Sequence, residues 1–372
     1  MLESSIAGTF IYNDLAKPRE AFVMTRGQYD QKGERVYPNT PAALPSLSKD
    51  SQREQPNRLD LAKWLVSDEN PLTARVTINR LWQQVFGVGI VKTSDDFGSQ
   101  GSPPVHPELL DALAFRYRAN GWNTKEMMKE MVRSDAFRRS ATVTPASWNI
   151  DPENRYLARG PRIRLDAEQI RDNVLAVSGL LNRAMGGSGV KGYQPGNIWE
   201  PVGYGDSNTR YYVQDHGNAL YRRSLYSFIK RTAPPPFMSN FDAPNRELFC
   251  TRRERSNTPL QALQLMNDIQ YVEAARVLAE SVLSDASIPT ERRIQRIFQL
   301  SLSRVPTTTE QEAMALALSK FQSRFQDHLE DAKKLVYVGE KPTNSLIPVQ
   351  DLAAYTLLAN LVLNLDETVN RN

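Results

Sequence analysis

The spacing of apolar residues changes at about residue 57. Residues 1–56 contain few periodic apolar positions and several prolines, which predicts an extended arm with a short strand over 22–25 and a turn over 28–34. From residue 57 onward, apolar residues recur three and four positions apart, the spacing of a helix that buries one face. The pattern therefore predicts a mainly α protein, a multi-helix bundle-like architecture with minor β structure.

Three helices are predicted between residues 57 and 140 from their start and stop signals. Proline is favoured at the first helical position, Asn and Asp at the cap before it, and Gly just after the end. The predicted boundaries are Asn70-Pro71 to Gly87, Pro107 to Gly121, and a start at Asn123 with Glu126 as its capping partner. Together these helices predict one compact bundle.

The middle of the chain combines one helix with a long irregular stretch. Asp166 is placed to cap a helix whose apolar stripe runs from Ile170 to Leu181. Residues 186–205 then contain seven of the 19 glycines, and loops of this length in compact domains are usually functional or disordered. A β-prone run over 225–229 predicts one strand.

The last third of the chain is predicted to be helical again. Thr258-Pro259 combines a cap with a first-position proline, and apolar stripes follow over 272–282 and 294–301. Thr309 with Glu312 opposite predicts the start of a long helix toward Lys334. A final apolar helix over 352–362 is expected to be buried.

These patterns suggest four segments. They are an arm over 1–56, a helical domain over 57–185, an irregular Gly/Pro/aromatic-rich segment with minor β structure over 186–256, and a helical region over 257–372. No Ser/Gly-rich or acidic tether separates them, so we expect them to pack as one unit.

Composition limits the possible partners and cofactors. The net charge of +4 comes from 46 basic and 42 acidic residues without a strongly basic run, so we expect no nucleic-acid partner. With one cysteine, Cys250, the chain can form no intrachain disulfide and no Cys-based zinc or haem site. No apolar run reaches the ~18 residues of a membrane span, and no signal peptide is recognisable at the N-terminus.

The first candidate site combines Asp95, Asp96 and His106. Two adjacent carboxylates and an imidazole are suited to holding a hard divalent metal or to acid–base catalysis. Alternatively, the Asp pair binds backbone N–H groups of its own turn, and His106 occupies the cap position of the helix that begins at Pro107.

The second candidate site combines Arg231, Asp242 and Arg246 in Pro-rich irregular backbone. A guanidinium offers fixed paired donors to an anionic or polyhydroxylated ligand, and Asp242 is a further candidate for a catalytic carboxylate. Alternatively, Arg231 and Asp242 pair with each other and fix the loop.

Aromatic residues are spread through the Gly-rich stretch. Trp199, Tyr204 and Tyr211 are candidate ligand-binding residues, with Tyr193 and Tyr212 nearby, because aromatic faces with polar tips bind sugars and proteins. Alternatively, these side chains fasten a long loop to the body of the protein.

Familiar catalytic signatures are missing from the sequence. It contains no Gly-x-Ser-x-Gly, phosphate-binding loop, dinucleotide fingerprint or His-Glu-x-x-His. The sequence therefore does not decide whether the protein is an enzyme.

Many stretches resemble the planctomycete-type secreted domain of unknown function. The matching stretches span nearly the whole chain and include Arg26-Gly-Gln-Tyr-Asp, Arg58-Leu-Asp-Leu-Ala-Lys-Trp-Leu, Asn70-Pro-Leu-Thr-Ala-Arg-Val, Asn79-Arg-Leu-Trp, Phe86-Gly-Val-Gly-Ile-Val, Asp95-Asp-Phe-Gly, His106-Pro-Glu-Leu-Leu-Asp, Arg164-Leu-Asp-Ala-Glu-Gln-Ile-Arg-Asp, Arg223-Ser-Leu-Tyr, Phe241-Asp-Ala-Pro, Arg252-Arg-Glu-Arg-Ser-Asn-Thr-Pro-Leu-Gln and Asn364-Leu-Asp-Glu. The resemblance implies an exported, largely helical module that in longer proteins accompanies a cytochrome-c-like domain. It brings no established catalytic residues.

Three functional hypotheses follow. The first is a non-catalytic interaction or carbohydrate-associated module in an extracytoplasmic (periplasmic or secreted) assembly. The second is a hydrolase or lyase that acts on an acidic glycan. The third is a docking domain for a c-type cytochrome, and the resemblance also implies an exported sulfatase-like partner. We expect no haem in this chain, because the Cys-x-x-Cys-His motif is missing, whereas a divalent metal stays an open alternative.

Overall fold

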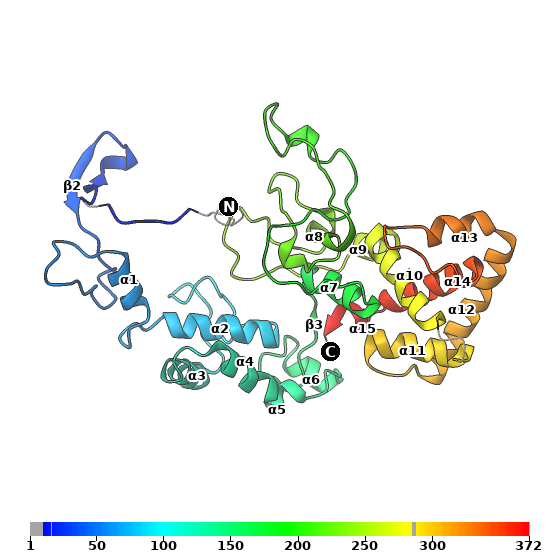
Figure 1. Cartoon of the computed structure of the whole chain (residues 1–372). Helices are drawn as coiled ribbons and strands as arrows, with labels where there is room; N and C mark the ends of the chain where they lie inside the picture. The colour runs from blue at the N-terminus through cyan, green and yellow to red at the C-terminus, as the bar shows by residue number, and fades with distance from the viewer. Residues whose placement is uncertain (1–9, 16, 285–287, 372) are drawn as a thin grey trace. The chain divides into compact units, whose positions relative to one another are not determined.

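The computed structural model describes residues 10–15, 17–284 and 288–371. Its internal contacts divide the chain into two compact units, Met1–Pro161 and Arg162–Asn372 (Figure 1). Both units are built mainly from α-helices with a few short strands, which confirms the predicted fold class.

The first unit begins with a hairpin and continues as helices. Its elements are β1 (Ala21–Met24), the 3-10 helix η2 (Thr25–Gly27), β2 (Lys32–Val36), α1 (Arg58–Leu65), α2 (Thr73–Phe86), α3 (Pro107–Ala119), α4 (Thr124–Arg133), α5 (Asp135–Arg138) and α6 (Pro145–Ile150). β1 and β2 pair antiparallel, with Ala21 opposite Val36. The predicted strand over 22–25 is therefore confirmed to within one residue, whereas β2 was not predicted.

The core of the first unit lies between α2, α3 and α4. Ile78 on α2, Leu110 and Leu113 on α3, and Met127 and Met131 on α4 are all buried. The predicted start at Asn123 is confirmed, because its side chain accepts a hydrogen bond from the Glu126 backbone at 3.1 Å.

A buried asparagine on α2 binds the backbone of the loop that comes after this helix. Asn79 is fully buried, its Nδ2 donates to the Val91 carbonyl at 3.0 Å, and its Oδ1 accepts from the Val91 N–H at 2.8 Å. The side chain thus satisfies the backbone of residue 91 as a neighbouring strand would. Two of the stretches that carry the family resemblance therefore meet in a structural contact.

The second unit contains the remaining elements. They are β3 (Ile163–Arg164), α7 (Ala167–Ser178), the 3-10 helices η3 (Glu200–Val202), η4 (Gly217–Ala219) and η5 (Ser224–Tyr226), α8 (Pro236–Ser239), α9 (Pro259–Asn267), α10 (Ile269–Leu283), α11 (Thr290–Leu302), α12 (Thr308–Asp327), α13 (Leu329–Val336), α14 (Val349–Leu363), α15 (Asp366–Val369) and β4 (Asn370–Arg371). β3 and β4 pair antiparallel and bring the two ends of the unit together.

Helix α14 forms the centre of the second unit, packed against α10, α12 and α13. Small residues on the facing surfaces, including Ala275 on α10 and Ala354 on α14, are completely buried and let the helices approach closely. The prediction that the last helix is buried is confirmed.

A buried arginine connects α7 with the irregular segment. Arg171 is 2% exposed, and its guanidinium donates to the carbonyls of Leu220 and Arg222 at 2.7 and 2.8 Å and to the side chains of Ser224 and Gln270 at 3.1 and 2.6 Å. One side chain therefore satisfies acceptors on two separate segments, because a guanidinium carries five donors in a fixed geometry.

Some boundaries differ from the sequence predictions. The strand expected over 225–229 is wrong: η5 and a single bridge between Val190 and Ser227 occupy this region. Thr307 with Glu310, rather than Thr309 with Glu312, caps α12, and the long helix breaks at His328. The helix capped by Asp166 packs against α10, so the boundary expected at 185 lies between Pro161 and Arg162.

Candidate functional site

The irregular segment folds around the indole of Trp199. This side chain is 1% exposed and contacts the rings of Tyr212 and Phe228, with centroids 4.8 and 5.6 Å away. The Tyr212 hydroxyl donates to the Gly192 carbonyl at 2.5 Å. Trp199 therefore fastens the segment from inside, the alternative that the sequence left open, and it offers no exposed face to a ligand.

A closed loop projects from this aromatic base. Two successive turns, Ser207 N–H to the Tyr204 carbonyl at 3.0 Å and Arg210 N–H to the Ser207 carbonyl at 3.1 Å, lead the chain back on itself. Gly203 lies directly against Arg210, because a Cβ at position 203 would be 3.0 Å from the Arg210 Cα. We call this contact between Gly203 and Arg210 the neck of the loop. A side chain at position 203 would push the two segments apart.

The neck presents two tyrosines to solvent. Tyr204 is 88% exposed and Tyr211 is 58% exposed, and each directly follows one of the two residues that meet at the neck. The Arg210 guanidinium lies 5.2 Å from the centre of the Tyr211 ring, within the range of a cation–π contact. The residues that precede the two tyrosines, Gly203 and Arg210, are thus in contact although they are seven positions apart in the chain.

Two lysines lie against the base of the same loop. The Lys230 ammonium is 5.2 Å from the centre of the Trp199 ring and donates to the Thr209 carbonyl at 2.8 Å. The Lys191 ammonium is 5.7 Å from the same ring and 5.6 Å from the Phe228 ring. The sequence reasoning overlooked both lysines, because nothing in their spacing connects them with Trp199.

A polar network fastens the segment on its other side. The Tyr221 hydroxyl donates to fully buried Glu273 on α10 at 2.9 Å, and Glu340 N–H donates to the Tyr193 hydroxyl at 2.8 Å. Burial, together with the negative charge of Glu273, raises the pKa of Tyr193 to about 12. Tyr193 is therefore a neutral hydrogen-bonding residue at physiological pH.

The second predicted site is taken up by internal contacts. Asp242 has a left-handed φ of 58° and accepts hydrogen bonds from the Ser256 N–H at 2.6 Å and hydroxyl at 2.7 Å. Arg246 pairs with Glu168 at 3.6 Å. Arg231 is exposed and, among the described residues, forms no ion pair with Asp242. The expected Arg231–Asp242 pair is therefore not formed, and Ser256 takes its place.

The first predicted site lies in the other unit. Asp95 is exposed, Asp96 accepts a hydrogen bond from Gly98 N–H at 2.7 Å, and His106 precedes α3 with its ring 5.9 Å from that of Tyr156. The His106 side chain makes no capping bond. Over residues 10–15, 17–284 and 288–371, no three His, Cys, Asp or Glu side chains form a group that could hold a metal ion.

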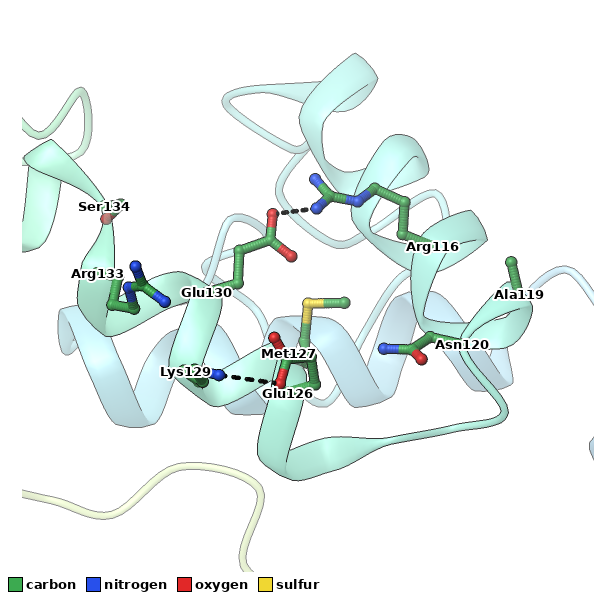
Figure 2. Close-up of a pocket in the computed structure, with 9 residues that line it drawn as sticks. All are labelled: Arg116, Ala119, Asn120, Glu126, Met127, Lys129, Glu130, Arg133 and Ser134. Carbon is green, nitrogen blue, oxygen red and sulfur yellow. Dashed lines mark ion pairs between the residues drawn. The ribbon is translucent and has the colours of Figure 1, made fainter.

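A cavity of about 770 Å³ lies beside α3 and α4 in the first unit (Figure 2). Arg116 pairs with Glu130 at 2.6 Å and Lys129 pairs with Glu126 at 3.5 Å, while Met127 lies between these pairs. The two acidic residues of its lining are thus each paired with a basic residue, and Arg133 is the third basic residue of the lining.

The model of a family described as PSD1, protein of unknown function (DUF1553), matches residues 57–318, so the chain belongs to this family. The match excludes the N-terminal arm and the end of the second unit, including the resembling stretches at 26–30 and 364–367. No curated protein and no solved structure matches the chain.

The structure gives one further observation on membranes. In the part of the chain that it describes, no helix has both the length and the apolar character needed to cross a bilayer.

Proposed function

We propose that the protein is a non-catalytic binding module that holds carbohydrate on the exposed tyrosines of the loop over 199–213. The observation that carries this proposal is the pair Tyr204 and Tyr211, both exposed and held at one neck by the close approach of Gly203 and Arg210. Sugar rings have apolar faces that stack on aromatic rings, while the tyrosine hydroxyls can hydrogen-bond to sugar hydroxyls.

The base of the loop supports the same proposal. Trp199 and Tyr212, near the two ends of the loop, pack together with Phe228, so the backbone that carries the two tyrosines is restrained and less entropy is lost on binding. The proposal keeps the extracytoplasmic setting that the family resemblance implies, where polysaccharide is an available ligand. A c-type cytochrome or a sulfatase-like partner would then contact other surfaces of the protein.

Binding to a set of immobilised plant and bacterial polysaccharides tests the proposal. Tyr204→Ala and Tyr211→Ala should each weaken binding about 2- to 10-fold, the range for loss of one aromatic contact. Tyr337→Ala is the matched control, because this tyrosine of the same unit is 63% exposed and lies after α13, outside the loop. Equal binding by all four proteins would refute the proposal, as would an absence of binding to every polysaccharide.

Gly203→Ala gives a second test that leaves both tyrosines in place. The added methyl group meets the Arg210 backbone, whereas the same change at Gly205 meets nothing within 4 Å. Weaker binding by Gly203→Ala, but not by Gly205→Ala, would show that the geometry of the neck matters as well as the aromatic content.

A further inference from the structure

We propose that the base of this loop recognises an oxyanion, so that the ligand of the binding module carries carboxylate, sulfate or phosphate groups. The inference rests on the proposed function for the identity of the ligand as a glycan, but the anion site itself rests on separate residues. These residues are Lys191 and Lys230, which lie against the Trp199 ring, and Arg210, which lies against the Tyr211 ring.

The first argument is the placement of the three cations. The ammonium groups of Lys191 and Lys230 both lie within 6 Å of the Trp199 ring centre, and Lys230 bonds to the carbonyl of Thr209, the residue before Arg210. All three side chains belong to half-buried residues, where positive charge is costly without a counter-charge.

The second argument is the shortage of acceptors. In the described part of the chain, none of these three cations forms an ion pair with a carboxylate. Asp215 accepts a hydrogen bond from the backbone N–H of Lys191 at 2.7 Å but makes no ion pair with its ammonium. Between residues 191 and 230 there are five Lys and Arg residues against three Asp and Glu residues.

The third argument is the set of unpaired donors within the same segment. The indole N–H of Trp199, the Arg210 Nε–H and the Gln194 amide are buried and have no acceptor among the described residues. The Trp199 side chain is only 1% exposed. Buried donors are normally satisfied, so this segment holds more donors than the acceptors that it offers them.

An oxyanion supplies what this segment lacks. A carboxylate or sulfate brings two or three acceptor oxygens and a negative charge, and charge-assisted hydrogen bonds are about twice as strong as neutral ones. On a glycan, the sugar ring would lie on Tyr204 or Tyr211 while the anionic substituent reaches Lys191 and Arg210. The cations thus add charge selectivity to the aromatic contact.

Affinity electrophoresis with three polymers tests the inference on the whole chain. Polygalacturonate carries carboxylates, dextran sulfate carries sulfate esters, and dextran is neutral. We expect retention by one of the charged polymers and none by dextran. Lys191→Gln should weaken retention about 10-fold, as expected for one lost charged contact. Lys191 makes no side-chain hydrogen bond in the described residues, so this variant should fold.

Lys334→Gln is the matched control, because it removes the same charge from an exposed site on α13. Equal weakening by both variants would mean that the basic protein binds polyanions through net charge alone, and it would overturn the inference. Equal retention of the protein by dextran and by the charged polymers would also overturn the anion site. If Tyr204→Ala then lost this retention, the proposed carbohydrate-binding function would still be supported.

If no polymer is retained, titration with sodium sulfate and with sodium acetate under thermal unfolding separates the two proposals. Stabilisation of the wild type by either anion at constant ionic strength, lost in Lys191→Gln but kept in Lys334→Gln, would support the anion site while the carbohydrate proposal fails. A wild type indifferent to both anions would overturn the anion site.

Discussion

Replacing Trp199 with alanine should destabilise the second unit strongly. The indole is 1% exposed and packs against Tyr212 and Phe228. A buried tryptophan removes about 150–250 Å² from water, and at ~25 cal/mol per Å² this amounts to about 4–6 kcal/mol. Residual structure in the unfolded chain reduces the value to about 3–5 kcal/mol, the usual cost of Trp→Ala in a core.

Calorimetry and urea unfolding can measure this loss. For a unit of this size, 1 kcal/mol corresponds to about 2–4 °C, so the Tm of the second unit should fall by about 6–20 °C. Trp199→Phe should cost only about 1–2 kcal/mol, because it keeps an aromatic ring and its lost N–H has no acceptor among the described residues.

Trp148→Ala is the control for this experiment. Trp148 is 55% exposed on α6, and surface substitutions usually change stability by less than about 0.5 kcal/mol. If Trp199→Ala unfolded at the same urea concentration as Trp148→Ala, the indole would not fasten the loop that carries the two exposed tyrosines. Loss of ligand binding in Trp199→Ala alone would not distinguish a binding residue from a structural one.

Three further changes test other parts of the second unit. Arg171→Met should cost about 3–5 kcal/mol, measured by urea unfolding, because it leaves several buried acceptors without a donor. Hydrogen bonds from the Arg304 side chain and, to a smaller extent, from the Thr307 backbone N–H lower the pKa of Glu310 to about 2, below its unfolded value of about 4.3. The stabilisation by this carboxylate is therefore present above about pH 4 and lost as the pH falls toward 2, and Glu310→Gln should flatten that part of the acid-unfolding curve. Gly339→Ala should lower the Tm by several degrees, because φ at 339 is +87° and the new methyl group would overlap the buried carboxylate of Glu273, whereas an unchanged Tm would show that the loop adjusts.

Most helices could be predicted because their signals are local. The starts at Pro107, Asn123 and Thr258 depend on residues within one turn of the cap, and the structure confirms each of them. The strand expected over 225–229 failed because β propensity needs a partner strand, and only a single bridge to Val190 is present.

Helix α9 shows where the apolar pattern does not locate the core. Gln261 and Gln264 are 1% and 8% exposed, whereas Leu260 and Leu263 are 54% and 57% exposed. The inward glutamines bond to Asn240, with Gln261 Nε2 donating to its carbonyl at 2.9 Å and Gln264 Oε1 accepting from its Nδ2 at 2.8 Å. Hydrogen-bond partners that lie more than twenty residues away therefore decide which face of this helix is buried, and local composition does not contain that information.

The candidate site was only half predictable for the same reason. The sequence identified the aromatic residues of the Gly-rich segment but could not separate Trp199, which is buried, from Tyr204, which is 88% exposed. That difference depends on Phe228 and Lys230, which reach the indole from beyond the loop. Lys230 has two roles, because its ammonium fixes the loop through the Thr209 carbonyl and also brings a positive charge to the base of the loop. A basic residue that supports an aromatic platform from a distant part of the chain has no sequence signature, so the proposed charge selectivity follows from the fold and was not accessible from the motif.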